Sequence, residues 1–421
     1  MSPVPPAPDE ATALRWAIRD DALPEVAALL GPDAGEIVDG ALPPPPGSEP
    51  IRLRRVAWQA GRTITCLFER PQRDATAAPQ SIVAEADRDP ASGTTSGIRL
   101  WEGRDDPVLT GLRQALDGPA LEDWLDTLDV ARGPVERRLL VHRPRRRAVI
   151  EVRRGGERLF LKVVRPSAVA GIRDRHRELA GRLPVPTILG TSEDLGLVVL
   201  QALDGTSLFD AVINGRRPSA QVITEVISRI RACPPIARTA SSAIDRVPEH
   251  VAALSLLLPD EAMRLAAIAD AIGPDPQPVG TVVHGDLHPG QILVADEHVT
   301  GILDLDTMAM GRRGDDPANV LAHLASIAAG GNGGSPAWRI ESIRFAVALQ
   351  ARLDEDHDPA DLRLRTAAAL LGLAAGQFQS QHPAWPARIR DLISAAESWL
   401  ASSMAVRSPI DPSMSVSSPA P

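Results

Sequence analysis

The stretch VVHGDLHPGQILVADEHVTGILDLD, residues 282–306, contains two polar clusters that are separated by apolar segments. The first cluster is HGDLHPGQ (284–291) and the second is DLD (304–306). The apolar segments QILVA and VTGIL have the composition of short strands. If these strands pair as a hairpin, both polar clusters lie at one end of a small sheet. The stretch therefore predicts a site in which aspartate and amide side chains meet.

The side chains of these clusters suit two chemical tasks. One aspartate can accept a proton, and a second aspartate together with an amide oxygen can hold a hard metal ion. Mg²⁺ prefers oxygen ligands and usually takes only one or two carboxylates plus substrate phosphates. Phosphoryl transfer needs little else from a protein beyond a positioned nucleophile, this metal and a cation on the phosphates that are not transferred. The clusters are therefore typical of phosphoryl-transfer chemistry.

A single lysine lies upstream of this stretch, in the segment RLFLKVVRP (158–166). Lys162 is the only lysine among the 45 lysine and arginine residues of the 421-residue chain. The alternating pattern predicts a strand in which Phe160, Lys162 and Val164 share one face, and a Gly-Gly turn joins this strand to the preceding one. Because an unpaired ammonium group is expensive to bury, we expect a carboxylate or phosphate partner for Lys162.

The segment AGIRDRHRELAGRL (170–183) has the periodicity of a helix. Its apolar stripe is predicted to contain Ile172 and Leu179. Of the two carboxylates in this segment, Glu178 lies on the flank of the stripe, beside Leu179. We therefore expect Glu178 to reach Lys162 and form an ion pair with it.

The motif HGDLHPGQILV followed by GILDLD resembles the catalytic and metal-binding loops of the aminoglycoside phosphotransferase and choline-kinase-like family, which shares the protein-kinase-like fold. The resemblance implies that Asp286 is the catalytic aspartate and that Gln291, five residues later, is the metal-binding amide. It also implies that Asp304, eighteen residues after Asp286, is the metal-binding aspartate. Asp306 is either a second metal ligand or only a turn residue. We expect the two histidines of the motif to orient the loop rather than to act as acid–base groups.

The same resemblance places the nucleotide. Lys162 would hold the α- and β-phosphates, and Glu178 would pair with Lys162. The segment VLQALDG (199–205) would be the interlobe hinge, whose backbone receives adenine. The hinge residues concerned are Gln201, Ala202 and Leu203. The resemblance thus implies ATP and Mg²⁺ as cofactors.

Three features depart from the pattern of this family. Gln291 stands where asparagine is usual, which extends the side chain by one methylene group. The loop VHRPRRRAVIEV (141–152) contains no glycine, so backbone amides cannot approach phosphates as freely as in a glycine-rich loop. Its arginines Arg145 and Arg147 are candidates for phosphate binding, although exposed arginines are common in hairpins. In the later segment GRRGDDPANVLAHL, a valine replaces the second aspartate of the family.

The glutamine of the motif and a β-rich region before the kinase lobes are also similar to actinobacterial maltokinase-like enzymes. The implied fold is α+β: a protein-kinase-like bilobal fold with an antiparallel β N-lobe, a mainly helical C-lobe and an extra N-terminal β-rich cap. In the cap, four apolar runs separated by turn-forming residues predict an antiparallel meander. The predicted parts are the cap (1–130), the N-lobe (131–203), the C-lobe (204–402) and a disordered Ser/Pro-rich tail (403–421).

Composition and charge limit the partners of this protein. The formal net charge of −9 argues against a nucleic-acid binder, which needs a basic surface to neutralise phosphates. No apolar run has the length of a membrane span, and the first residues lack the basic and apolar regions of a signal peptide. The two cysteines have no metal-binding spacing and are expected to be buried thiols. We therefore expect a cytoplasmic monomer or weak homodimer without nucleic-acid or membrane partners.

The expected function is that of an ATP- and Mg²⁺-dependent small-molecule kinase. Its acceptor is expected to be a hydroxyl group of a sugar or amino sugar, because the glutamine and the cap resemble those of maltokinase-like enzymes. An aminoglycoside phosphotransferase is the second interpretation. A nucleotide-binding pseudokinase or regulatory module is the third, because the loop lacks glycine and the amide of Gln291 is longer than that of asparagine.

Overall fold

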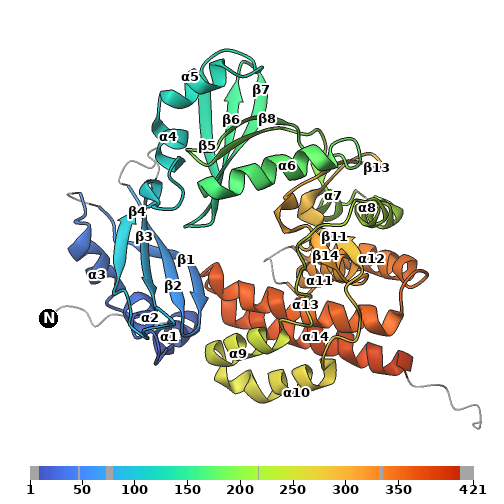
Figure 1. Cartoon of the computed structure of the whole chain (residues 1–421). Coiled ribbons are helices and arrows are strands. Elements are labelled where there is room, and N and C mark those ends of the chain that lie inside the picture. Colours follow the sequence, from blue (N-terminus) through green and yellow to red (C-terminus); the bar gives the residue numbers. More distant parts are fainter. Residues whose placement is uncertain (1–8, 46–47, 73–78, 217, 331–334, 408–421) are drawn as a thin grey trace, which may run out of the picture.

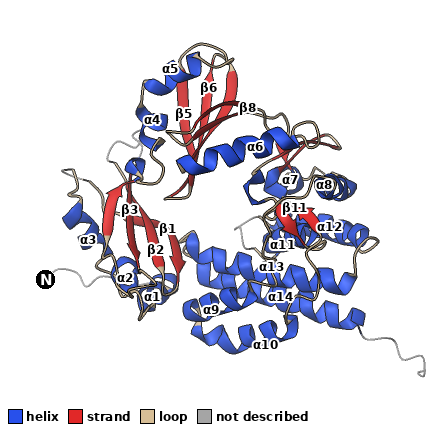
Figure 2. Cartoon of the chain, viewed as in Figure 1, coloured by secondary structure: helices blue, strands red, loops and turns tan. Residues whose placement is uncertain are grey.

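The computed structural model describes residues 9–45, 48–72, 79–216, 218–330 and 335–407 of the chain. Figure 1 shows a cap in blue to light cyan, an N-lobe in cyan to green, and a C-lobe in olive green to red. The two largest sheets lie in the cap and the N-lobe, and the C-lobe is mainly helical (Figure 2). The architecture is therefore the predicted α+β fold with an extra N-terminal β-rich cap.

The cap consists of three helices and a four-stranded antiparallel sheet. Its elements are α1 (Glu10–Ala17), α2 (Glu25–Leu30), α3 (Ala34–Ala41), β1 (Arg52–Gln59), β2 (Thr63–Arg70), β3 (Gln80–Asp87) and β4 (Arg99–Glu102). The strands follow one another in the order β1-β2-β3-β4, which is the predicted meander. On β2, Ile64, Cys66 and Phe68 alternate into the core and are buried, because side chains at every second position share one face of a strand.

The cap packs against the C-lobe through a shared hydrophobic core. Side chains from its helices and from β1, β2 and β3 form one buried cluster with C-lobe side chains. The C-lobe helices that contribute include α9 (Val247–Leu257), α10 (Ala262–Ile272), α13 (Pro359–Gln379) and α14 (Trp385–Arg407). At the edge of this core, Glu10 and Arg390 form an ion pair at 2.8 Å. The cap is therefore held on the C-lobe by apolar burial, as well as by charge.

The N-lobe is a five-stranded antiparallel sheet with one long helix. Its elements are β5 (Val135–Arg143), β6 (Arg147–Arg154), β7 (Glu157–Val164), α6 (Val169–Leu179), β8 (Ile188–Ser192) and β9 (Leu197–Gln201). The strand order is β5-β6-β7-β9-β8. The predicted turn between β6 and β7 is present, and both of its glycines, Gly155 and Gly156, have positive φ angles. Lys162 lies within β7, opposite Val149 on β6 and Val198 on β9.

Two short helices precede the N-lobe sheet and cover it. They are α4 (Leu112–Asp117) and α5 (Ala120–Asp126). Leu112, Leu121 and Leu125 are buried in one cluster with side chains of β6, β7 and β9. Their packing therefore joins these helices to the N-lobe rather than to the cap sheet.

The C-lobe surrounds two small antiparallel sheets with helices. The first sheet has the order β10-β12-β13 and the second pairs β11 with β14. These strands are β10 (Thr206–Ser207), β11 (Thr281–Val283), β12 (Ile292–Ala295), β13 (His298–Ile302) and β14 (Ala309–Gly311). The remaining helices of this lobe are α7 (Leu208–Ile213), α8 (Gln221–Arg231), α11 (Asp315–Ala328) and α12 (Pro336–Leu353).

The last helix is longer than the sequence predicts. The predicted tail begins at residue 403, but α14 continues to Arg407. Residues 408–421 lie outside the described part of the chain. No helix among the described residues combines the length and the apolar character that a membrane span requires.

Candidate active site

Strands β12 and β13 form the hairpin that the sequence predicts. Ile292 lies opposite Ile302, and the backbone N–H of Leu303 donates to the carbonyl oxygen of Gln291 at 2.9 Å. Strand β11 leads into the first polar cluster, and its antiparallel partner β14 follows the second. The two polar clusters therefore lie next to each other at one end of these small sheets.

A buried carboxylate from α11 holds the loop that carries Asp286. Asp316 is 3% exposed, and its two oxygens accept hydrogen bonds from the backbone N–H groups of His284 at 2.8 Å and Gly285 at 3.0 Å. Nε2 of His284 also donates to the carbonyl oxygen of Leu303 at 2.9 Å. These hydrogen bonds connect the two polar clusters, and the contact of the His284 ring is of the orienting kind that the sequence predicts.

Gly285 has a conformation that few other residues adopt without strain. Its φ angle is +80°, and a Cβ atom at this position would lie 2.7 Å from the carbonyl oxygen of Thr307. A left-handed backbone next to another carbonyl group favours glycine, which has no side chain to clash. This glycine therefore allows the Asp286 loop to approach the loop of the second cluster.

Replacing Asp316 by alanine is expected to lower the free energy of unfolding by about 2–4 kcal/mol, because two buried backbone N–H groups would lose their acceptor. Urea unfolding followed by far-UV circular dichroism measures this change. Asp356→Ala, at an exposed position after α12, is the control and should remain within about 0.5 kcal/mol of the wild type. An Asp316→Ala protein as stable as the wild type would contradict the anchoring role of Asp316.

The second polar cluster begins with an unusual backbone conformation. Asp304 has φ 55° and ψ 59°, in the left-handed region that is uncommon outside glycine. The following 3₁₀ turn, η5 (Leu305–Thr307), is held by two arginines. Arg175 donates to the first carbonyl oxygen of this turn at 3.0 Å, and Arg238 donates to the carbonyl oxygen of Asp306 at 2.8 Å. These contacts fix the backbone from which the two carboxylates project.

Lys162 reaches the second cluster from the N-lobe. Although Lys162 is only 7% exposed, its Nζ donates to Oδ1 of Asp304 at 3.2 Å and also to Oδ2 of Asp306. Arg147, at the start of β6, forms an ion pair with Oδ2 of Asp304 at 2.7 Å. Burial disfavours the ionised form of Asp304, but the charges of Lys162 and Arg147 outweigh it and hold the pKa of Asp304 below its usual range. Cations of the N-lobe therefore contact carboxylates of the C-lobe where the two lobes meet.

The sequence of this region identifies its family. Residues 140–339 match the sequence model of the phosphotransferase enzyme family. This region is a domain of that family. The matched segment includes Lys162, Asp286, Gln291 and Asp304, and the sheet and helices of the cap precede it.

Several solved structures resemble the phosphotransferase domain at low sequence identity. A thermostable mutant of the aminoglycoside phosphotransferase APH(4)-Ia, in ternary complex with AMP-PNP and hygromycin B, is 17% identical with a TM-score of 0.47; the match covers 67% of this chain and 98% of that chain. The macrolide 2'-phosphotransferase MphH from Brachybacterium faecium is 18% identical with a TM-score of 0.38, over 67% of this chain and 97% of that chain. No curated protein matches the sequence of this chain.

The predicted ion pair between Lys162 and Glu178 is not formed in the phosphotransferase domain. Glu178 is exposed on α6, and the carboxylates that Lys162 contacts are those of Asp304 and Asp306. The buried residues of α6 include His176, which lies two positions before Glu178 and therefore points to a different side of the helix. Glu178 cannot pair with Lys162 because the buried stripe of α6 passes through His176 rather than along the flank that carries Glu178.

The two candidate arginines of the glycine-free loop have different surroundings. Arg147 points toward the C-lobe and forms the ion pair with Asp304. Arg145 instead faces the cap: its side chain pairs with Glu85 on β3, and its backbone N–H donates to Asp106 at 2.6 Å. The φ angle of Arg145 is +60°, which turns this residue away from its neighbours in the β5–β6 connection. Arg145 therefore binds carboxylates of its own chain, contrary to the phosphate-binding role that the sequence suggests.

Gln291 has a free oxygen atom beside Asp286. Its Nε2 lies 3.5 Å from Oδ2 of Asp286. Gln291 is only 7% exposed, and its Oε1 has no hydrogen-bond partner among the described residues. Because a buried polar atom without a partner is costly, this oxygen is a candidate for binding a ligand.

The predicted hinge follows β9. The backbone N–H of Gln201 donates to Thr187 at 2.9 Å, and that of Ala202 donates to Arg158 at 3.4 Å. Within the described residues, the backbone N–H and C=O of Leu203 have no hydrogen-bond partner. The predicted hinge thus has a free donor and a free acceptor at Leu203.

His288 is the second histidine of the motif, and its ring packs inside the C-lobe. It stacks on His323 with ring centroids 4.6 Å apart, and its Nδ1 accepts from the backbone N–H of Gly290 at 3.1 Å. Burial lowers the pKa of His288, and burial lowers the pKa of His323 to about 3. Both rings are therefore neutral near neutral pH, which favours an orienting role for His288.

Sequence reasoning missed three residues that shape this site. Asp316 lies in a segment with resemblance to the family, but its hydrogen bonds to the Asp286 loop are made across 31 and 32 residues of chain. Arg175 and Arg238 hold the η5 turn through main-chain carbonyl oxygens. Such contacts leave no pattern in a sequence that is rich in arginine.

Proposed function

We propose that this protein is an ATP- and Mg²⁺-dependent kinase that transfers the γ-phosphoryl group of ATP to a hydroxyl group of a small molecule. The observation that supports this proposal is the arrangement around the β12–β13 hairpin. Asp286 and Gln291 are adjacent in the first cluster, and Asp304 of the second cluster contacts Lys162 from the N-lobe. The candidate proton acceptor, the candidate metal ligands and the candidate phosphate-binding cation are thereby connected where the two lobes meet.

In the proposed reaction, Asp286 orients the acceptor hydroxyl group and accepts its proton. The acceptor oxygen forms a bond to the γ-phosphorus, and the bond from this phosphorus to the bridging oxygen breaks, so that ADP leaves with the electron pair. Lys162 and Arg147 would contact the phosphates that remain on ADP. The backbone at Gln201, Ala202 and Leu203 would bind adenine, and Glu178, exposed on α6, has no part in this proposal.

Side chains from both polar clusters would fit a magnesium ion. The free Oε1 of Gln291 and the carboxylate of Asp304 would be protein ligands, with Asp306 as a further candidate. The described residues contain no group of three or more histidine, cysteine, aspartate or glutamate side chains suited to a metal ion. One or two carboxylates with phosphates and waters suffice for Mg²⁺. When bound, Mg²⁺ would neutralise charge on the phosphate oxygens.

Nucleotide binding is expected to depend on Mg²⁺ and on Gln291. Chelation with EDTA should weaken AMP-PNP binding, measured by calorimetry, by about 10- to 100-fold, because the phosphate charge loses its counter-ion. Gln291→Leu keeps the size of the side chain but removes the free oxygen, so it should lose much of this metal dependence. Gln114→Leu, at an exposed position on α4, is the control. Equal metal dependence in the wild type and Gln291→Leu would contradict a ligand role for Gln291.

The acceptor is proposed to be a carbohydrate, on the basis of the resemblance to maltokinase-like enzymes that the sequence alone suggests. A panel of acceptors with γ-labelled ATP tests this proposal. The panel should include neutral sugars, amino sugars, aminoglycosides and simple alcohols. Labelled product only with a non-carbohydrate alcohol would contradict the carbohydrate preference. Nucleotide binding without labelled product on any acceptor would instead favour a nucleotide-binding regulatory module.

A further inference from the structure

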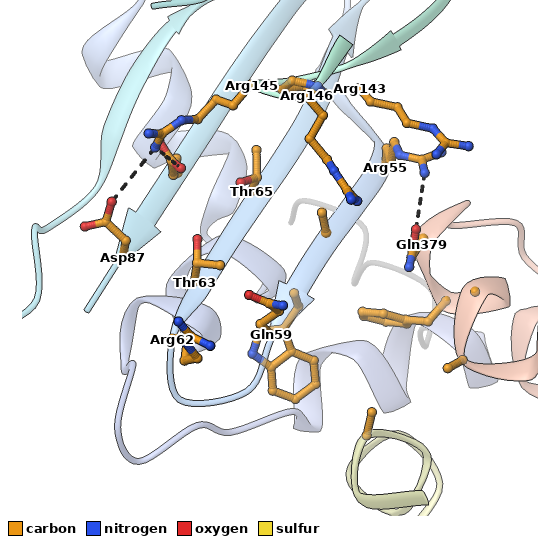
Figure 3. A pocket seen from close by; sticks show the side chains of 18 of the residues that line it. Arg55, Gln59, Arg62, Thr63, Thr65, Asp87, Arg143, Arg145, Arg146 and Gln379 are labelled. Carbon is orange, nitrogen blue, oxygen red and sulfur yellow. Dashed lines mark hydrogen bonds and ion pairs between the residues drawn. The ribbon is translucent and has the colours of Figure 1, made fainter. Parts of the chain in front are cut away.

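A large cavity lies where the cap, the N-lobe and the C-lobe meet. Its volume is about 960 Å³. The cap contributes one wall through β1, β2 and β3, and the connection between β5 and β6 contributes another. Helices α9 and α13 close the C-lobe side. Figure 3 shows side chains from these three parts pointing into the cavity. The volume is sufficient for a small organic ligand.

The wall of this cavity has an excess of positive charge. Eight arginines and four carboxylates are found among the described residues that line it. Two of these carboxylates, Glu85 and Asp87, are already near Arg145, which pairs with Glu85 and lies 3.9 Å from Asp87. Figure 3 shows Arg145 and Asp87 on one side of the cavity and Arg143 with Arg55 on the other. Within the described residues, the other two carboxylates, Asp89 and Glu249, form no ion pair with Arg55 or Arg143.

Three arginines of this second side have no carboxylate partner. Within the part of the chain that the structure describes, Arg143 and Arg146 form no ion pair, and Arg55 donates only to Oε1 of Gln379, at 3.2 Å. Burial and repulsion from neighbouring arginines lower the pKa of both Arg55 and Arg143. An anion between these guanidinium groups would relieve this repulsion, and guanidinium groups bind phosphate and carboxylate through paired hydrogen bonds.

Arg143 connects this cavity with the catalytic loop. It lines the cavity, and in the pairing of β5 with β6 it lies opposite Arg147, which forms the 2.7 Å ion pair with Asp304. The hinge residues proposed to bind adenine are not among the residues that line the cavity. Asp286 is not a lining residue either, so the cavity adjoins the catalytic loop through Arg143 and lies apart from the predicted hinge.

We propose, on the basis of the kinase function above, that this cavity is the acceptor site and that it selects an anionic carbohydrate. A phosphate or carboxylate group of the acceptor would bind to Arg55, Arg143 and Arg146, while its reactive hydroxyl group meets Asp286. Thr63 and Thr65 on β2 offer hydroxyl groups to the rest of the molecule. The same positive wall disfavours an amino sugar or an aminoglycoside, because their ammonium groups would face arginine. The cap thereby takes part in choosing the substrate.

Calorimetry on the full chain, saturated with AMP-PNP and Mg²⁺, tests this assignment with matched probes. The probes are glucose, glucosamine, glucuronate and glucose 1-phosphate. Glucuronate or glucose 1-phosphate is expected to bind at least about tenfold more tightly than glucose, and glucosamine more weakly than glucose. Equal or tighter binding of glucosamine, or no binding of either anionic probe, would overturn the proposal.

Two variants and one control locate the anion. Arg55→Gln is expected to weaken binding of the anionic probe by about 10- to 100-fold, with little effect on glucose. Because Arg55 is partly buried, Arg146→Gln, at an exposed turn position, is a second variant whose folding is not at risk. Arg54→Gln, on the same strand and paired with Glu69, is the control. Unchanged binding in both Arg55→Gln and Arg146→Gln would overturn the assignment.

Competition and turnover separate this proposal from the kinase function. If AMP-PNP displaced the anionic probe, the arginines would belong to the nucleotide, and the acceptor assignment would be overturned. If an anionic probe bound in an Arg55-dependent manner but no acceptor received labelled phosphate, the kinase function would fail while the anion site remained. If neutral sugars were phosphorylated as well by Arg55→Gln as by the wild type, and anionic sugars were not substrates, the kinase function would remain while the anionic acceptor failed.

Discussion

Replacing Asp286 by asparagine is expected to lower kcat by about two to four orders of magnitude, because the acceptor hydroxyl group loses its proton acceptor. Asparagine has the same shape and retains a polar group next to Gln291, so the loop should keep its hydrogen bonds from His284 and Gly285 to Asp316. The affinity for AMP-PNP should therefore change little. Turnover with γ-labelled ATP and calorimetry with AMP-PNP measure the two properties separately.

The matched control for this change is Asp270→Asn, which makes the same substitution at an exposed position on α10. Its kcat should equal that of the wild type. Wild-type kcat in Asp286→Asn would refute the role of Asp286 in proton transfer. A loss of AMP-PNP affinity as large as the loss of kcat would instead assign Asp286 to nucleotide binding.

The sequence predicts the part of the site that depends on pairing between neighbouring segments of the chain. The β12–β13 hairpin requires only pairing between neighbouring segments, and Ile292 opposite Ile302 brings the two polar clusters together. Spacing within one short stretch therefore suffices to place Gln291 next to Leu303. The meander of the cap is predicted for the same reason, since its strands pair only with their neighbours in the sequence.

The partner of Lys162 could not be predicted in this way. Its contacts with Asp304 and Asp306 cross 142 and 144 residues of chain and join two lobes. The nearer candidate, Glu178, is excluded by the phase of α6, which places His176 in the buried stripe. A periodic pattern states which face of a helix is buried, but it does not state which distant residue that face will meet.

The arginine-lined cavity could not be predicted from the sequence at all. Arg55 lies on a strand of the cap, Arg143 at the end of an N-lobe strand, and Gln379 at the end of α13. In the sequence, nothing distinguishes these arginines from the many other arginines of the chain, which are expected to be exposed. Only the docking of the cap on both lobes brings these guanidinium groups together. This docking depends on apolar burial between segments that are distant in the sequence. The spacing of charged residues therefore does not predict it.

Replacing Lys162 by arginine keeps the charge but is expected to lower kcat/KM for ATP by about 10- to 100-fold. Lys162 is 7% exposed, and its neighbours in the sheet are Val149 and Val198. A planar guanidinium group is larger than an ammonium group, so it must either strain this packing or shift away from Asp304. Steady-state kinetics over a range of ATP concentrations measure kcat/KM, and urea unfolding measures any loss of stability.

The control for Lys162→Arg is Arg158→Lys, the reverse exchange on the same strand. The side chain of Arg158 is about half exposed. This variant should leave kcat/KM unchanged, because its ion pair with Glu151 does not involve the cleft. Since Lys162→Arg alters shape without altering charge, a loss of activity would report the geometry of the contact with phosphates and carboxylates. Full activity of Lys162→Arg would mean that any cation suffices on this strand. Catalysis would then not require lysine rather than arginine at position 162.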